Sequence, residues 1–158
     1  MIDPARFEAV RASIMLQGLD DDDLTRLAAV CEERHMAEGT TVFIENMPGE
    51  SLFLIRQGLI RISKMFAEGD EQHLVVLGPA QFFGEMAVID GLPRAATARV
   101  VESAELISLR KKDFEALGQN YPALALKLVT NIVRVFSKQV RESHDEYRDM
   151  LIWSIQGN

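Results

Sequence analysis

The segment FFGEMAVIDGLPRAATARV, from Phe82 to Val100, places an acid, Glu85, nine positions before a base, Arg94. The guanidinium of an arginine is a planar donor fork that can hold two phosphate oxygens at once. A carboxylate beside a phosphate would be repelled by it, so Glu85 is better suited to accept a hydrogen bond from a sugar hydroxyl. The segment therefore predicts a ligand that carries one anionic phosphate and a nearby hydroxyl.

The small residues of this segment favour a bound ligand. Gly84 allows a close backbone approach, and Ala95 and Ala96 leave space beside Arg94. Glu85 opens a short apolar stretch that could be helical, and a helix N-terminus presents free N–H groups to an anion. A Glu85–Arg94 salt bridge that ties the loop is the alternative, because ion pairs of this kind are common. The chemistry of the residues alone leaves both interpretations open.

The chain on either side of this segment has the pattern of β-strands. From Arg34 to Arg110, short apolar or alternating runs are separated by turn residues. The runs are Thr41–Ile44, Leu52–Ile55, Leu59–Met65, His73–Leu77, Ala96–Val101 and Leu106–Leu109. Because no crossover helices fit between runs of this length, the pattern predicts an antiparallel sandwich or barrel.

A helical pattern precedes the strands. The stretch from Pro4 to Gln17 predicts one short helix, and its apolar face would contain Phe7, Val10 and Ile14, with Met15 as a further candidate. The four aspartates from Asp20 to Asp23 could bind a metal ion. Since no His, Cys or EF-hand spacing accompanies them, we interpret them as the N-cap and acidic first turn of a second helix.

A second helical pattern follows the strands. Lys112 to Leu117 predicts a short helix that ends near Gly118, and Pro122 suits the first turn of a long helix without a breaker up to Gln156. One apolar seam has alternating spacings of three and four: Leu126, Val129, Val133, Phe136, Val140, Ser143, Tyr147 and Met150. A second face contains Leu124, Leu128, Ile132 and Val135. The two faces predict that this helix packs on the strand domain with one face and on the same helix of a second subunit with the other. The alternative is a helix whose two faces are both covered by its own domain.

Composition narrows the class of protein. The formal net charge is −7, and the longest basic run, Arg110-Lys111-Lys112, is best explained as a solvated turn, so we expect no nucleic-acid partner. No apolar stretch is long enough for a membrane span, and a single cysteine, Cys31, favours the cytoplasm. The chain has three isolated histidines, His35, His73 and His144, and none shows a nucleophile–base pairing or a metal-binding spacing. We therefore expect a binding protein that holds no metal and is not an enzyme.

The pattern Gly84-Glu85-Met86-Ala87-Val88, then five residues, then Arg94-Ala95-Ala96-Thr97-Ala98 resembles the phosphate-binding cassette of cyclic nucleotide-binding domains. The resemblance implies an antiparallel β-roll of eight strands with N-terminal helices before it and a long helix after it. It implies that Glu85 binds the ribose 2′-hydroxyl and that Arg94 binds the cyclic phosphate. Backbone groups would complete the cradle at Gly84, Met86, Ala87, Ala95 and Ala96.

The resemblance also bears on the base of the ligand. Family members that prefer cGMP often carry Thr directly after the cassette arginine, where this chain has Ala95, so the ligand is expected to be cAMP, with cGMP as the alternative and no other cofactor. Leu74 and Leu77 are the expected walls for the base. Relatives also contact the base from the long helix, and counting along that helix leads to Gln139.

These expectations give three segments: an N-terminal helix at 1–18, the nucleotide-binding β-roll at 19–120, and a dimerisation helix with its tail at 121–158. The expected function is a regulatory sensor that couples cAMP binding to the position of the long helix. A scaffold of the same fold, with Glu85 and Arg94 paired structurally, is the alternative. One turn departs from the family pattern: it contains Asn46-Met47-Pro48-Gly49, and Asn46 tolerates the left-handed conformation that the turn requires.

Overall fold

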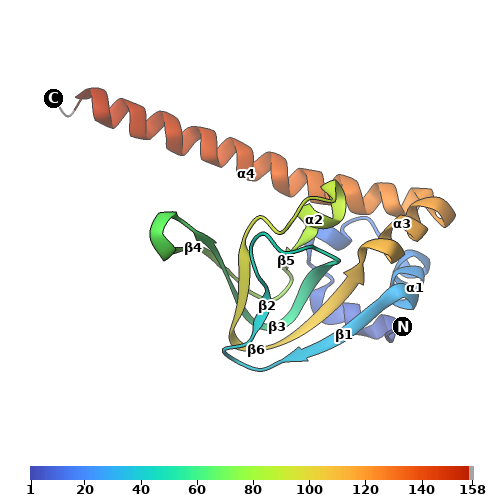
Figure 1. The fold of residues 1–158 in the computed structure, drawn as a ribbon. Coiled ribbons are helices and arrows are strands. Elements are labelled where there is room, and N and C mark those ends of the chain that lie inside the picture. The colour runs from blue at the N-terminus through green and yellow to red at the C-terminus, as the bar shows by residue number, and fades with distance from the viewer. Residues whose placement is uncertain (157–158) are drawn as a thin grey trace.

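An antiparallel sheet with helices at both ends forms the body of the protein (Figure 1). The computed structural model describes residues 1–156. Six strands are present in them: β1 (Cys31–Met36), β2 (Thr41–Phe43), β3 (Ser51–Met65), β4 (Glu71–Leu77), β5 (Phe82–Phe83) and β6 (Thr97–Arg110). The main order is β1-β6-β3-β4, with β2 paired to β6 and β5 paired to β3. The expected fold, an antiparallel β-roll with N-terminal helices and a long C-terminal helix, is confirmed.

Two long strands, β3 and β6, form the centre of the sheet. Each joins two runs that the sequence pattern separated, and their pairing shifts register on both sides of Gly58. Gly58 has a φ of 89°, and a Cβ there would lie 2.5 Å from the carbonyl oxygen of Ser103. Glycine therefore lets β3 bend without ending. This continuity explains why the described residues hold six strands instead of the eight that the resemblance implied.

The N-terminal segment differs from its prediction. In place of one helix, it forms two 3₁₀ helices, η1 (Pro4–Val10) and η2 (Ile14–Leu16). The hydroxyl of Ser13 accepts from the N–H of Met15 and starts η2, which buries Met15 and leaves Ile14 46% exposed. A continuous helix with Ile14 on its buried face was thus a wrong expectation.

The aspartates before α1 (Asp21–Val30) are a helix cap. The carboxylate of Asp20 accepts from the N–H of Asp23 at 2.8 Å, and that of Asp23 accepts from the N–H of Asp20 at 3.4 Å. This reciprocal pair satisfies donors that the helix itself leaves free. The predicted N-cap is confirmed.

Three helices lie after β5. They are the short α2 (Glu85–Asp90), α3 (Lys111–Asn120), which continues through Gly118 instead of ending there, and α4 (Pro122–Gln156). The first turns of α4 bury Leu124, Leu128 and Ile132 in a core shared with η1, α1 and the ends of β3 and β6. The rest of α4 extends past the domain, and Figure 1 shows it projecting beyond the hairpin of β3 and β4.

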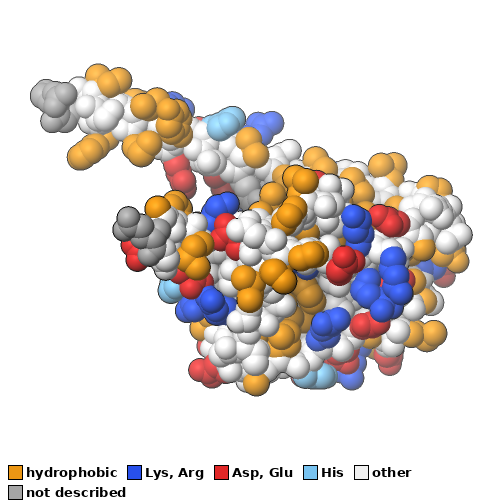
Figure 2. Space-filling model, viewed as in Figure 1, with side chains coloured by type: hydrophobic (Ala, Val, Ile, Leu, Met, Phe, Trp, Pro, Cys, Tyr) orange, Lys and Arg blue, Asp and Glu red, His pale blue; other side chains and the backbone are white. Residues whose placement is uncertain are grey.

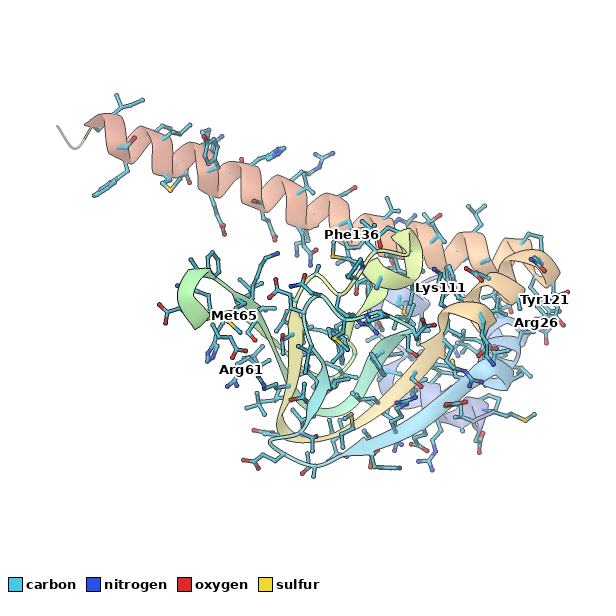
Figure 3. All side chains as sticks on the ribbon, viewed as in Figure 1. Arg26, Arg61, Met65, Lys111, Tyr121 and Phe136 are labelled. Atoms are coloured by element: carbon cyan, nitrogen blue, oxygen red, sulfur yellow. The ribbon has the colours of Figure 1, made fainter. Side chains whose placement is uncertain are left out.

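Polar contacts fix the start of α4 to the N-terminal segment. The ammonium of Lys127 lies 2.5 Å from the carboxylate of Asp23, and the buried amide of Asn131 donates to the carbonyls of Met15 and Gln17. Beside them, the guanidinium of Arg26 stacks over the ring of Tyr121 at 4.9 Å (Figure 3). The beginning of α4 is therefore held to this segment by both apolar packing and directional contacts.

Beyond Phe136, α4 is exposed. Its predicted seam faces solvent there, with Val140 53% exposed, and Figure 2 shows hydrophobic side chains gathered on the far end of the helix. The two apolar faces of α4 are thus distinct, since one packs on the domain and the other remains open. None of the helices in residues 1–156 combines the length and the apolar character that crossing a membrane requires.

Candidate functional site

One cavity brings together almost all of the residues that the sequence singled out. It opens between the sheet, α2 and α4. Its lining contains Gly84, Glu85, Met86, Ala87, Arg94, Ala95, Ala96, Leu77 and Gln139, together with Phe43, Ile62, Val75, Phe82 and Phe83. The segment from Phe82 to Ala96 forms one end of this cavity, and β3, β4 and α4 form the other.

A backbone turn positions Arg94. The N–H of Arg94 donates to the carbonyl of Met47 at 2.8 Å, and the N–H of Asn46 donates to the carbonyl of Arg94 at 2.9 Å. Asn46 has a φ of 68°, so the predicted left-handed conformation at this turn is confirmed. The turn after β2 and the loop before β6 thereby hold each other in place.

The side chain of Arg94 is a buried cation, only 5% exposed. Its two terminal nitrogens, Nη1 and Nη2, donate to the carbonyls of Gly84 and Ser51, each at 2.7 Å. Its Nε is also buried and has no hydrogen-bond partner within the described part of the chain. Burial lowers the pKa of Arg94, while the carboxylates of Glu85 and Glu50 oppose that shift. An arginine has five N–H donors, so the guanidinium retains donors without a partner, and no carboxylate is hydrogen-bonded to it among the described residues.

Glu85 lies at the first position of α2, next to Arg94 but not joined to it. Gly84 has a φ of 78° and turns the chain from β5 into α2, which aims Glu85 at the cavity. Burial raises the pKa of the Glu85 carboxyl, opposed by its own backbone N–H and by the charge of Arg94. The ion pairs among residues 1–156 do not include a Glu85–Arg94 bridge. The pairing that defined the scaffold alternative is therefore not formed.

Small residues shape the floor of the cavity. A Cβ at Gly49 would lie 2.2 Å from the Cβ of Ala87 and 3.0 Å from Nε of Arg94, so α2 and the turn after β2 approach as closely as their backbones allow. The first N–H groups of α2, near Met86 and Ala87, have no partner inside the helix. This end of the cavity can therefore offer backbone donors as well as the arginine.

The other end of the cavity is apolar and corrects one expectation. Val75 and Leu77 line it from β4, and Ile62 lines it from β3. Leu74 does not, and its side chain is 55% exposed. The register between β3 and β4 shifts after the Ile62↔Val75 pair, which leaves Leu74 at the irregularity while Val75 and Leu77 share one face. The choice of Leu74 as a wall was wrong.

Five lining residues were not among the site residues expected from the sequence: Phe43, Ile62, Val75, Phe82 and Phe83. The alternation of Ile60 and Ile62 with polar residues along β3 would have identified Ile62, because residues two apart share a face of a strand. In β4 the run from Leu74 to Leu77 is entirely apolar and does not show which residues face the cavity. Phe43 carries no such local signal, since it reaches the cavity from the end of β2. Gln139, which was found only by counting along the helix, does line the cavity, and it does so from α4.

The chemistry available in this cavity is binding. Its polar groups are one buried guanidinium, one carboxylate and backbone donors, facing an apolar wall. Within residues 1–156, the side chains of His, Cys, Asp and Glu do not gather in groups of three or more that could hold a metal ion. A small anionic ligand with a hydroxyl and a flat apolar part would satisfy these groups together.

Comparison with known families gives a match over more than half of the chain. The family described as "Cyclic nucleotide-binding domain" matches residues 33–121, which contain β2 to β6, α2 and α3. The matched range includes the whole segment from Gly84 to Ala96, so the family assignment covers the end of the cavity that holds Glu85 and Arg94.

Individual proteins are similar over a wider range. The chain is 28% identical over 134 residues to the Cyclic AMP receptor protein of Thermus thermophilus, covering 85% of this chain and 60% of that protein. The crystal structure of Thermus thermophilus Catabolite Activator Protein superposes with a TM-score of 0.78 at 28% identity, over 89% of this chain and 64% of the other. The regulatory domain of Toxoplasma gondii PKA, solved with cAMP, gives a TM-score of 0.66 at 31% identity, over 72% and 43%. The chain thus spans about 60% of the length of the first of these relatives.

Proposed function

This chain belongs to the cyclic nucleotide-binding domain family, and we propose that it binds cAMP and passes the binding signal to its long helix, α4. In this proposal the β-roll of residues 19–120 holds the nucleotide, and residues 121–158 carry the response and join two copies of the chain. Residues 1–18 brace the start of α4.

The state of Arg94 is the observation that carries the proposal. Nη1 and Nη2 are fixed by two carbonyls, Nε is buried without a partner, and no carboxylate is bonded to the guanidinium among the described residues. A buried charge without a counter-ion is costly in a folded protein. The cyclic phosphate would supply that counter-charge and accept the remaining N–H groups, together with the backbone at Ala95 and Ala96.

The ribose and the base then follow from the rest of the cavity. Glu85 accepts the 2′-hydroxyl, with backbone groups of Gly84, Met86 and Ala87 beside it. The base lies between the apolar wall that includes Leu77 and the side chain of Gln139 on α4. Ala95 offers no hydroxyl to guanine, which favours cAMP over cGMP.

Contact between the ligand and the middle of α4 would couple binding to the position of this helix. The first turns of α4 are fixed to the N-terminal segment by Lys127 and Asn131, whereas Gln139, which lines the cavity, lies after them where packing is thin. A base placed against Gln139 would favour one orientation of this second part. A ligand that interacts differently with two orientations shifts the equilibrium between them.

Thermal unfolding of nucleotide-free protein tests ligand binding. Saturating cAMP should raise the melting temperature more than cGMP does, because a ligand that binds only the folded state stabilises it. 5′-AMP is the control, since its phosphate is not cyclised. Equal melting temperatures with and without cAMP would remove the proposal.

Distance measurements test the coupling. The thiol of Cys31 is buried, and burial raises its pKa to about 12, so cysteines introduced by Thr41→Cys and Glu146→Cys can be labelled selectively with a dye pair. Energy transfer between them should change when cAMP binds. A pair at Thr41→Cys and Glu102→Cys, both on the roll, should not respond. If the first pair gives the same transfer with and without bound cAMP, the coupling is absent.

Sedimentation tests the pairing of copies. Val140→Glu places a charge on the open seam of α4 and should convert dimers to monomers, whereas Arg141→Glu, on the neighbouring face, should not. A wild-type chain that sediments as a monomer at all concentrations would exclude dimerisation through α4.

A further inference from the structure

The guanidinium of Arg94 is in close contact with an aromatic ring and lies near a glycine. Cζ of Arg94 is 4.0 Å from the ring centroid of Phe43. On the same guanidinium, a Cβ at Gly49 would lie 3.0 Å from Nε and 3.1 Å from Cζ. The side chain of Arg94 therefore has little freedom to leave its plane.

The ring of Phe43 is itself held in place. It belongs to a cluster of three phenylalanines, with centroids 6.2 Å from Phe53 and 5.8 Å from Phe83, and these two stack on each other at 5.2 Å. Phe43 is the last residue of β2 and pairs with Ala98 of β6, and Ala98 is fully buried. A ring fixed on two sides can act as a rigid support for the arginine.

An aromatic face stabilises the charge of an arginine without using its N–H donors. A carboxylate in the same position would also stabilise the charge, but it would accept the N–H groups that a phosphate needs. In this site the ring of Phe43 faces the guanidinium, while the carbonyls of Gly84 and Ser51 take one donor from each terminal nitrogen. The remaining N–H groups of Arg94 have no hydrogen-bond partner among the described residues.

We propose that Phe43 is a positioning residue that fixes the orientation of the Arg94 guanidinium and stabilises its charge before a cyclic phosphate binds. The role of Phe43 in phosphate binding rests on the proposed function. The placement of its ring against Arg94 is independent of that function. Phe43 acts through Arg94 and has no hydrogen bond to offer a ligand. Its effect should therefore disappear when the planar fork of Arg94 is removed.

Nuclear magnetic resonance of the nucleotide-free protein tests the placement alone. The Nε–H signal of Arg94, assigned by its loss in Arg94→Lys, should be displaced by the ring current of Phe43. In Phe43→Leu this displacement should vanish, while in Phe53→Leu it should persist, because Phe53 belongs to the same cluster without facing Arg94 in the cation–π contact. An Nε–H signal that Phe43→Leu leaves unmoved would overturn the inference, whether or not cAMP binds.

Affinity for cAMP tests the consequence. Phe43→Leu should weaken binding about tenfold, the range expected for a partly desolvated cation–π contact, and Phe43→Tyr should restore most of the loss. In an Arg94→Lys background, Phe43→Leu should cost much less, because the two residues act as a unit. Phe53→Leu controls for damage to the aromatic cluster.

The outcomes separate the two proposals. Equal losses for Phe43→Leu and Phe53→Leu, or the same loss with Lys at position 94, would mean that the ring only fills space, and the inference would be wrong. If the wild type does not bind cAMP, the proposed function and the ligand role of Phe43 both fall, while the resonance experiment still decides the placement. Melting curves of each variant establish that it is folded when measured.

Discussion

Glu85 and Arg94 line one cavity, yet Arg94 donates to the carbonyls of Gly84 and Ser51 and not to the Glu85 carboxylate. The turn at Gly84 places Glu85 at the start of α2, where its carboxylate does not pair with Arg94. In the proposed site, each side chain therefore remains free for its own contact with the ligand, Glu85 as an acceptor and Arg94 as a cation. An internal salt bridge would have neutralised both, and a ligand would then have to break it.

The first prediction concerns Arg94. Arg94→Lys keeps a positive charge but loses the planar fork, so cAMP affinity should fall by about 1.5–3 kcal/mol, or roughly ten- to a hundredfold. Equilibrium dialysis measures this. Arg99→Lys is the matched control, because Arg99 pairs with Glu71 away from the cavity. Equal affinities of Arg94→Lys and Arg99→Lys would show that Arg94 does not hold the phosphate.

The second prediction concerns the ribose. Glu85→Gln should weaken cAMP binding by about 1–2 kcal/mol, because a hydrogen bond to a charged acceptor is stronger than one to an amide. The same substitution should hardly change the affinity for 2′-deoxy-cAMP, which lacks the hydroxyl. Competition binding with both nucleotides gives the comparison. A loss of the same size for the deoxy compound would place Glu85 elsewhere than at the 2′-position.

The third prediction concerns how the stability of the nucleotide-free protein depends on pH. Because burial raises the pKa of Glu85 above its ordinary 4.5, the folded state binds a proton more tightly than the unfolded state does. The contribution of Glu85 to the free energy of unfolding therefore falls as pH rises from 4.5 through the raised pKa of Glu85. Above that pKa the full loss of stability is present.

Glu85→Gln lacks this titration, so it isolates the effect. Urea unfolding of both proteins without nucleotide should show the variant gaining stability relative to the wild type as pH rises from 4.5 through the raised pKa of Glu85. The other titratable groups are shared and cancel in the difference. A difference that stays constant, or that shrinks as pH rises, would contradict the burial of this carboxylate.

The fourth prediction concerns close packing at Gly49. Gly49→Ala adds a Cβ 2.2 Å from that of Ala87, so α2 must shift, and Arg94 with it. Both the melting temperature and the cAMP affinity should fall. Gly118→Ala is the control: nothing lies within 4 Å of the new Cβ in α3, and alanine should stabilise the helix by about 0.5–1 kcal/mol. A Gly49→Ala protein with unchanged stability would show that the two backbones are not in contact.

The cassette could be predicted from the sequence because its parts are local. Gly84, Glu85, Arg94 and the alanines after it lie within one short segment, so their spacing already indicates that they line the same end of the cavity. The capped start of α1 and the two faces of α4 were predictable for the same reason. Each depends on residues separated by no more than a few helical turns.

The parts that were missed depend on distant pairing. β1 has the sequence CEERHM, which is mostly charged, and it forms because its backbone pairs with β6 from Cys31↔Leu109 to Met36↔Ala104. Phe43 reaches Arg94 only because β2 pairs with β6 beside the cassette. The irregularity at Leu74 arises between two strands and leaves no mark in either alone. Such features follow from the assembled sheet and not from local propensity.

Calorimetric titration tests the central claim most directly. Protein unfolded and refolded to remove any co-purified nucleotide is titrated with cAMP and then, separately, with cGMP. The proposed site predicts saturable binding of one cAMP per chain, tighter than cGMP and abolished or strongly weakened by Arg94→Lys. Absence of binding for both nucleotides by a folded protein, or affinity for cAMP that Arg94→Lys leaves intact, would contradict it.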